Sequence, residues 1–398
     1  MEIRAVTVGT EVEHRGDAIV FDRRIPGFLD SARLRFREMG VAVQTARIAS
    51  QPFPRVVPAD GDAVVGFARA FEWGAGEAGF GFVSIGPAAR STLQYVPHLA
   101  EALLATQHVF GTVIVDEPTD GLSLESVAAA ADVIDALARR SAHGFANQRF
   151  AVLANCPAGI PFFPAGYHAG GPTTFSIAWQ AADLALDAFE TSGSIGEARQ
   201  RLLELVEREG RRVATTATLL AEQHEIDFGG IDLSLAPGPD SAGSIGAAFE
   251  RLGVDAFGAP GTLFIASLIT DVLRRADLPR TGYSGLMLPV LEDVVLGRRA
   301  AEGTYTVNDL LLYSAVCGLG LDVVPLPGDT GIDELRGLIL DVATLAVRLD
   351  KPLSARLMPL PGKHAGDPAT FDYTFFAPAA VLPVKGRGAT RLFTREGL

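Results

Sequence analysis

The stretch SAVCGLGLD at residues 314–322, which continues as VVPLPGDT at 323–330, carries a helix end, a turn and a strand. An apolar run predicts a helix near 307–316, and Val323–Leu326 is typical of a short buried strand. The two glycines after Cys317 let the backbone between them take tight or left-handed conformations. A helix followed by a tight turn and a buried strand is the repeating unit of an α/β protein.

The same alternation of strand and helix patterns extends over most of the chain. Strands are predicted at residues 3–8, 41–48, 81–85, 112–115, 150–154, 231–235, 287–290, 323–326 and 355–360, with helical patterns between them. No long linker rich in serine or proline divides the 398 residues. We therefore expect one large α/β domain over 1–398 with mostly parallel strands and a helical insertion at about 174–226.

Composition argues against two classes of partner. The chain has 34 lysines and arginines against 47 aspartates and glutamates, a formal net charge of −13. Nucleic-acid phosphates and anionic membranes both attract clustered basic side chains. We expect a small-molecule ligand, no nucleic acid and no membrane.

The cysteines and the N-terminal residues suggest a cytoplasmic protein. Cys156 and Cys317 are the two cysteines, which is too few for a disulfide framework. The first residues lack the basic and apolar regions of a signal peptide, and no run of about 18 apolar residues predicts a membrane span. A homo-oligomer is expected because most soluble assemblies are homo-oligomeric.

Polar residues that follow predicted strands are the candidate site residues, because the carboxyl ends of strands carry sites in α/β proteins. Cys317 and His168 are the candidate catalytic residues, the thiol as nucleophile or proton carrier and the imidazole as acid or base. The alternatives are that Cys317 is a small buried hydrophobe, and that His168 bonds a backbone carbonyl.

The candidate metal ligands are carboxylates. Asp232 and Ser234 alternate on one strand, so their side chains share a face that suits a divalent cation or a hydroxyl group. Glu292 and Asp293 are further candidate metal ligands, although neighbours on regular structure point apart. An aspartate that anchors a loop is the alternative for Asp232.

Substrate contacts are expected from polar residues at the same turns. These residues are Asn155, Ser234, Asp322, Asp329, Thr330 and Lys363. An alternative for Asp329 or Thr330 is to cap the helix that begins near Gly331. An exposed position is the alternative for Lys363.

Several of these segments, in this order, resemble the DUF711 family, also called UPF0210, whose function is unassigned. They are IRAVTVG (3–9), PFFPAGYH (161–168), GIDLSLAP (230–237), ED (292–293), CGLGLD (317–322), PGDT (327–330) and PGK (361–363). The resemblance implies the barrel fold of the glycyl radical enzymes pyruvate formate-lyase and anaerobic ribonucleotide reductase. It places Cys317 at the position of their loop cysteine, and it suggests a small ACT-domain protein as a partner.

The radical chemistry of those enzymes is not expected here. Their radical glycine lies in an Arg-Val-small-Gly-aromatic context, which the C-terminal VKGRGAT at 384–390 lacks. A shared fold does not transfer a reaction.

Three functions remain open from the sequence. The first is an enzyme on a small polar metabolite that uses Cys317 and His168 inside the barrel, with no glycyl radical. The second is a metal-dependent enzyme in which Cys317 only packs. The third is a ligand-binding or regulatory protein without catalysis.

Overall fold

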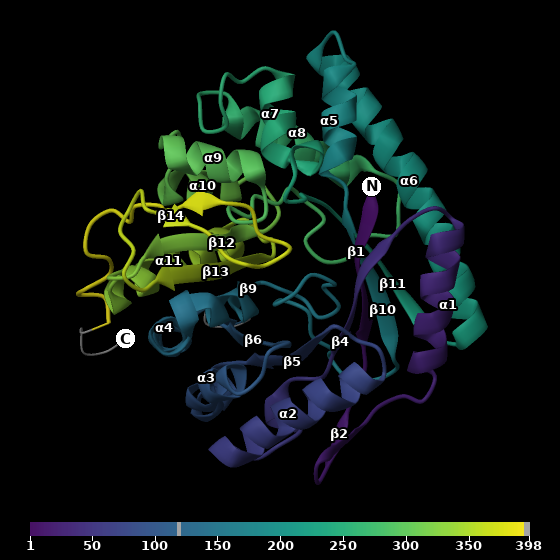
Figure 1. Ribbon diagram of the computed structural model, residues 1–398, viewed down its shortest axis with the longest axis vertical. Helices are drawn as coiled ribbons and strands as arrows, with labels where there is room; N and C mark the ends of the chain where they lie inside the picture. Colours follow the sequence, from purple (N-terminus) through teal and green to yellow (C-terminus); the bar gives the residue numbers. More distant parts are fainter. Residues whose placement is uncertain (118–120, 394–398) are drawn as a thin grey trace.

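The structure is a computed structural model that describes residues 1–117 and 121–393. In the described residues, nine strands form one large sheet in the order β11-β10-β1-β4-β5-β6-β9-β13-β12. Their bounds are β11 Asp227–Ala236, β10 Thr174–Gln180, β1 Glu2–Gly9, β4 Val43–Ala49, β5 Phe82–Ala88, β6 Val109–Ile114, β9 Phe150–Ala154, β13 Leu353–Leu360 and β12 Gly320–Pro327. This sheet runs through the middle of the molecule, with helices outside it (Figure 1).

The sheet is mostly parallel, as the alternation of strands and helices predicts. Its two antiparallel pairs are β1 with β10 and β9 with β13, and the other neighbours among the nine strands are parallel. The α/β class is therefore confirmed. The hydrogen-bond ladder leaves β11 and β12 as outer strands, so it does not establish the predicted barrel or its likeness to the glycyl radical enzymes.

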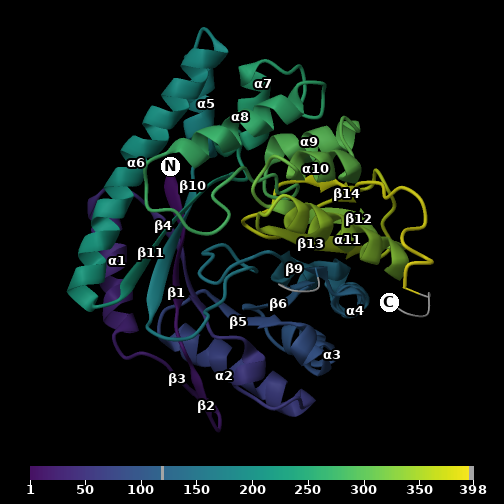
Figure 2. The ribbon, with the colours of Figure 1, turned by 180° about the vertical axis from the view of Figure 1, so that it is seen from behind.

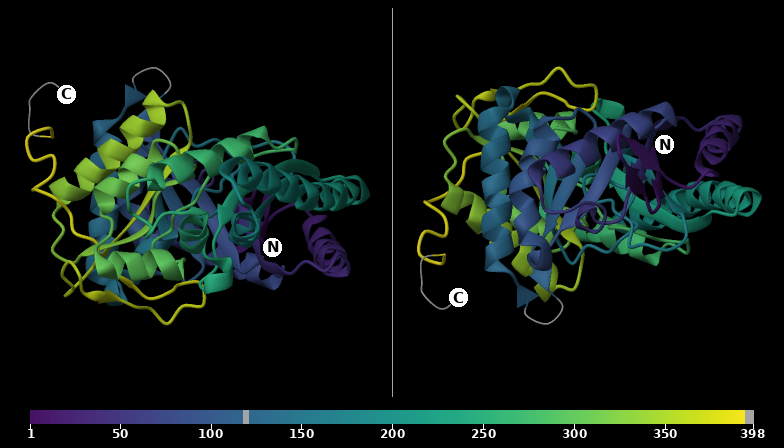
Figure 3. Two further views of the ribbon diagram at one scale, coloured as in Figure 1. Left: turned by 90° about the horizontal axis from the view of Figure 1, so that it is seen from above. Right: turned by 90° about the horizontal axis from the view of Figure 1, so that it is seen from below.

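Amphipathic helices cover the strands. The helix α1 (Ile25–Glu38) starts with a proline in its first turn and buries Ile25, Phe28, Leu29, Ala32 and Phe36, which recur at helical spacing. The other helices are α2 Gly61–Glu77, α3 Val96–Leu104, α4 Leu124–Arg140, α5 Ala182–Glu190, α6 Ile195–His224, α7 Ile245–Leu252, α8 Thr262–Arg275, α9 Val294–Glu302, α10 Val307–Ser314 and α11 Ile332–Arg348. Figure 3 shows α1 and α6 at one end of the molecule and the C-terminal segment at the other.

Two predicted elements differ from the structure. The helical insertion expected at about 174–226 begins later, because residues 174–180 form β10 inside the sheet. The segment TFSIAWQ is rich in β-branched and aromatic residues, and five of its seven residues are buried. The strand expected at 287–290 is irregular backbone.

The backbone between β11 and β12 bonds to both strands. Ile231 of β11 forms an isolated parallel bridge with Arg280. The Leu286 carbonyl accepts from Gly318 N, and Val290 N donates to the Asp322 carbonyl. The segment 280–290 therefore connects the two outer strands of the ladder through hydrogen bonds.

After β13 the chain is largely irregular and lies beside β12 and β13 in both views (Figures 1 and 2). Phe145 holds this segment through ring contacts with Phe371, Tyr373 and Phe376, at centroid distances of 5.4, 5.4 and 6.2 Å. Most buried hydrophobic side chains form one cluster that runs from Ile3 to Leu382, and two smaller clusters are separate from it. Division into domains stays a prediction.

No helix in the described part of the chain is both long enough and apolar enough to span a bilayer.

Candidate functional site

A cavity of about 50 Å³ lies against the large sheet, and residues of seven of its strands line it. This volume is several times the roughly 10–15 Å³ that one water needs, so it can hold a few waters or a small ligand. The charged lining residues are Arg4, Arg47, Glu292, Asp322 and Arg356. The aromatic ones are Phe82, Phe110, Phe162, Phe163, Tyr283, Tyr373 and Phe375.

Two of the arginines share the carboxylates of the cavity. Arg4 Nη2 lies 2.9 Å from Glu292 Oε2, and Arg356 Nη2 lies 2.9 Å from Glu292 Oε1. Arg356 Nε also donates to Asp322 Oδ1 at 2.6 Å. Burial raises the pKa of Asp322, opposed by Arg356, while the two carboxylates outweigh burial and raise the pKa of Arg356. This chain of ion pairs keeps Arg356 charged and satisfies both oxygens of Glu292.

Arg47 differs from the other two arginines. It is only 7% exposed, yet in residues 1–117 and 121–393 no carboxylate forms an ion pair with it. Its Nε donates to Thr45 Oγ1 at 3.0 Å. Burial, aided by the nearby Arg4, lowers the pKa of Arg47 to about 9. The guanidinium is therefore a charged group at neutral pH that has no carboxylate in ion-pair contact among the described residues.

Aromatic rings surround the Arg47 end of the cavity. The guanidinium carbon lies 5.6 Å from the Phe82 ring centroid and 5.5 Å from that of Phe163. Phe110 contacts both rings, with centroid distances of 5.4 Å each. Cation–π attraction offsets part of the cost of burying this charge, by about 0.5–2 kcal/mol. These rings supply no hydrogen-bond acceptor of their own.

The C-terminal segment contributes Tyr373 and Phe375 to the lining of the cavity. The Arg4 guanidinium carbon lies 4.2 Å from the Phe375 ring centroid. Burial raises the pKa of Tyr373, so its phenol is protonated at neutral pH and can donate a hydrogen bond. Exposed and half-buried positions alternate from Phe371 to Phe375, which directs Tyr373 and Phe375 inward and Asp372 and Thr374 outward.

The structure brings two of the sequence-predicted residues into this cavity. Glu292 and Asp322 line it, but their partners are arginines rather than a predicted metal partner such as Asp293. Among the described residues, no group of three or more His, Cys, Asp or Glu side chains is placed to hold a metal ion.

Asp232 and Ser234 share one face, as their spacing predicts, but that face is fully buried. Asp232 accepts from Ser234 Oγ at 2.6 Å, and from the backbone N–H groups of Tyr283 at 2.8 Å and Ser284 at 2.9 Å. Ser234 Oγ in turn accepts from Gly285 N at 3.1 Å. The pair holds the segment that connects β11 with β12, a contact of the kind that the loop-anchoring alternative expects, and a metal role for Asp232 stays a prediction.

Asp293 is also fully buried and caps helices. Its carboxylate accepts from Val295 N and Leu296 N at the start of α9, and from Ile245 N and Gly246 N at the start of α7. Because these amides engage both of its oxygens, its contacts are those of a helix cap.

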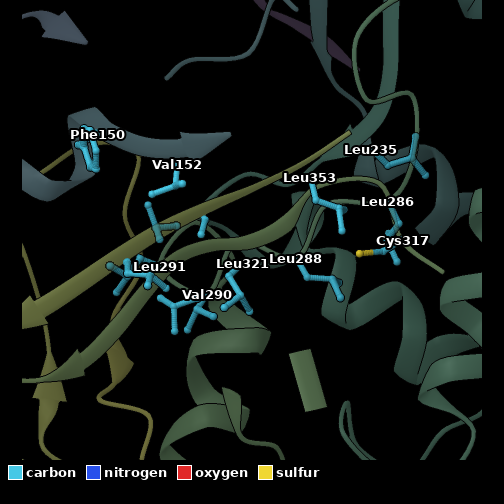
Figure 4. Close-up of a cluster of buried hydrophobic side chains, with 14 of the residues drawn as sticks. Phe150, Val152, Leu235, Leu286, Leu288, Val290, Leu291, Cys317, Leu321 and Leu353 are labelled. Carbon is cyan, nitrogen blue, oxygen red and sulfur yellow. The ribbon is translucent and has the colours of Figure 1, made fainter. Parts of the chain in front are cut away.

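Cys317 packs in the hydrophobic core and does not line the cavity. Its side chain is 1% exposed and lies close to Leu286 and Leu288 (Figure 4). Gly318 packs against Gly285 so closely that a Cβ would lie 2.6 Å from Gly285 Cα, which explains one glycine of this turn. The Cys317 carbonyl accepts from the buried Lys351 ammonium.

His168 lies elsewhere, beside β1. A Cβ placed on Gly9 would be 3.0 Å from its Nδ1, and its backbone N–H donates to Ser50 O at 2.9 Å. Burial lowers the pKa of His168, so its imidazole is neutral at pH 7. Neither His168 nor Cys317 lines the cavity, and their catalytic roles stay predictions.

The remaining predicted substrate contacts are outside the cavity. Asn155 donates to Asp350 at 3.2 Å, and Thr330 donates to the Pro327 carbonyl at 2.7 Å. Asp329 and Lys363 are exposed. Substrate roles for these four residues stay predictions.

Sequence reasoning missed the three arginines of the cavity. Each stands among apolar residues of a strand, as in IRAV at 3–6, ARIA at 46–49 and ARLM at 355–358. Charged residues are rarely fully buried without partners. A single arginine inside three separate apolar strands is therefore the sequence signal that points to an interior charged site.

Comparison with known proteins assigns the chain to a family. The family described as "Uncharacterised ACR (DUF711)" matches residues 1–372. A UPF0210 protein of Pyrobaculum arsenaticum is 34% identical over 83% of this chain and 76% of its own length. Others are 32% identical over 92% and 87% in Pyrobaculum aerophilum, and 29% identical over 90% and 83% in the bacterium Oleidesulfovibrio alaskensis. The chain belongs to the DUF711 family, whose relatives carry the name UPF0210, as its motifs predict.

Proposed function

We propose that this protein binds a small anionic metabolite in the cavity and that Arg47 is its anchor. The observation that carries the proposal is a buried guanidinium without a carboxylate partner in the described residues. An unpaired buried charge costs several kcal/mol of stability, roughly, when nothing compensates it. A bound anion supplies that compensation, and guanidinium is suited to hold a carboxylate or other oxyanion with two parallel hydrogen bonds.

The neighbouring groups support an anion at this place. Arg4 and Arg356 hold Glu292 between them, so this carboxylate does not compete for Arg47. The protonated Tyr373 phenol adds a neutral donor near the same cluster. The small volume selects a ligand of a few heavy atoms.

A binding experiment tests the proposal. Isothermal titration of the full chain with acetate, propionate, phosphate and sulfate should give saturable one-site binding for at least one of these anions. That anion should also raise the free energy of unfolding, by about 2.7 kcal/mol at an anion concentration one hundred times Kd. Binding should vanish in Arg47→Met and persist in Arg55→Met, whose arginine is exposed.

Two results would contradict the proposal. One is the absence of binding for every anion in the panel. The other is binding that survives Arg47→Met unchanged, which would place the anion at another cation.

We also infer that the sheet closes around the cavity as a barrel. Lining residues come from both outer strands, Ala236 of β11 and Asp322 of β12. The hydrogen bonds of the segment 280–290 to β11 and β12 support closure by this irregular segment. A barrel would explain why arginines of separate strands converge on one interior space.

Catalysis at the cavity stays a prediction. An enzyme that uses Cys317 and His168 needs both groups at the substrate, whereas neither lines the cavity. A metal-dependent reaction, an ACT-domain partner and a homo-oligomer also remain predictions. Of the three functions open from the sequence, ligand binding is the one that the cavity's contacts support best.

A further inference from the structure

The charges of the cavity limit the charge of its ligand. Three guanidinium groups face two carboxylates, which leaves one positive charge uncompensated when both acids are ionised. That charge lies on Arg47, because the other charged groups are paired with one another. A monoanion brings the buried set to neutrality, whereas a dianion leaves a buried negative charge, which is costly.

The carboxylates offer little to a cationic group. Both oxygens of Glu292 and one oxygen of Asp322 already accept from arginines. The ammonium of a zwitterion would lose its water and compete with these guanidinium groups for the same oxygens. The cavity therefore disfavours a ligand with an ammonium group.

The surface beside Arg47 is apolar. Phe82, Phe110 and Phe163 form a continuous set of rings next to the guanidinium. When the anionic group of a ligand binds Arg47, the rest of the ligand lies near these rings. Burial of a methyl or methylene group against them should tighten binding by about fourfold for each group.

We propose that the ligand is a short-chain monocarboxylate, with its carboxylate on Arg47 and its aliphatic part against the three phenyl rings. This proposal rests on the proposed function, because it names the chemical class of the anion. A carboxylate is a planar monoanion that matches the guanidinium fork, while phosphate is larger, tetrahedral and a mixture of monoanion and dianion at neutral pH. The cavity of about 50 Å³ limits the length of the chain.

A matched set of ligands tests the charge argument. Propionate, malonate and alanine have similar size, but malonate adds a second negative charge and alanine adds an ammonium group. Titration of the full chain should give propionate at least tenfold tighter binding than malonate, alanine or inorganic phosphate. Equal or tighter binding of any of these three overturns the proposal.

The pattern of failure separates the two proposals. If phosphate or malonate binds best and Arg47→Met removes that binding, the anion site stands and the monocarboxylate is wrong. If no anion binds, both proposals fail. If the affinity of propionate is the same in Arg47→Met, both fail as well.

Two variants test the charge count and the apolar contact separately. Glu292→Gln raises the uncompensated charge from one to two, so the preference for propionate over malonate should fall at least tenfold; an unchanged preference overturns the charge argument. Phe110→Tyr places a hydroxyl beside the aliphatic part, so the affinity ratio of propionate to formate should fall at least threefold. Phe228→Tyr, on a half-buried ring outside the cavity, should leave that ratio unchanged. An unchanged ratio in Phe110→Tyr removes the apolar contact and with it the proposal.

Discussion

Arg47→Met should stabilise the ligand-free protein. Burial lowers the pKa of Arg47 from 12.5 to about 9. Each pKa unit corresponds to about 1.4 kcal/mol, so burial of this charge destabilises the ligand-free folded state by about 5 kcal/mol. The variant also loses the cation–π attraction to Phe82 and Phe163, which reduces the expected gain in stability by about 0.5–2 kcal/mol. Loss of the hydrogen bond from Arg47 Nε to Thr45 Oγ1 takes away about 1.5–2 kcal/mol more. Methionine has a similar reach and packs well on aromatic rings, so we expect a net gain of about 1–3 kcal/mol.

Arg149→Met is the matched control. Arg149 is 6% exposed, close to the 7% of Arg47, and burial lowers its pKa to about 10. Its guanidinium, however, donates to the carbonyls of Leu103 at 2.7 Å and Val109 at 3.1 Å. Removing these donors costs about 1.5–3 kcal/mol for each bond, which cancels or exceeds the roughly 3.4 kcal/mol released by removing the buried charge, so this variant should show no gain or a loss of stability.

The assay is urea denaturation, followed by circular dichroism, in a buffer without carboxylates, phosphate or sulfate. The sign of the change separates the two arginines more safely than its size. A loss of stability in Arg47→Met as large as in Arg149→Met would refute the reasoning. It would mean that the guanidinium of Arg47 is already satisfied without a ligand.

Three further predictions follow from the same contacts. Anion affinity should be constant from pH 6 to 8 and should fall as the pH rises past about 9, because Arg47 then loses the positive charge that attracts the anion. Titration with the anion at several pH values checks this. A fall in affinity that begins below pH 8 contradicts it. Cys317→Ala should cost about 1–2 kcal/mol of stability by leaving a small gap in the core, with anion affinity within about twofold of the parent; a lost affinity would connect the sulfur to the site. Asp232→Ala should cost at least about 3 kcal/mol in denaturation, because buried amides of Tyr283 and Ser284 lose their acceptor; Asp329→Ala, at an exposed position, should have little effect.

The sequence predicts the strands well where apolar residues are continuous. The run IRAVTV and the stretch around Val324 become β1 and β12 within a few residues of their expected bounds. The helical prediction at 174–180 is wrong because a tryptophan and several apolar residues fit either period over so short a window. Packing between β1 and β11 decides the conformation of this segment, and that neighbourhood is invisible in the local sequence.

Candidate site residues are harder to predict, because a residue type does not reveal its partners. The spacing of Asp232 and Ser234 correctly predicts a shared face. That face contacts the backbone near Tyr283, about fifty residues later in the chain, which the local sequence does not reveal. Arg47 stands in an apolar strand, where a period-two pattern assigns a charged residue to solvent. Its position at an interior cavity depends on how separate strands converge.

The most direct test of the anion site is a crystal structure of the full chain grown with a short monocarboxylate such as propionate. Our account predicts electron density for the carboxylate within hydrogen-bond distance of both terminal nitrogens of Arg47, with the aliphatic part near Phe110. A cavity that contains only water, with Arg47 turned to pair with Glu292, would contradict it.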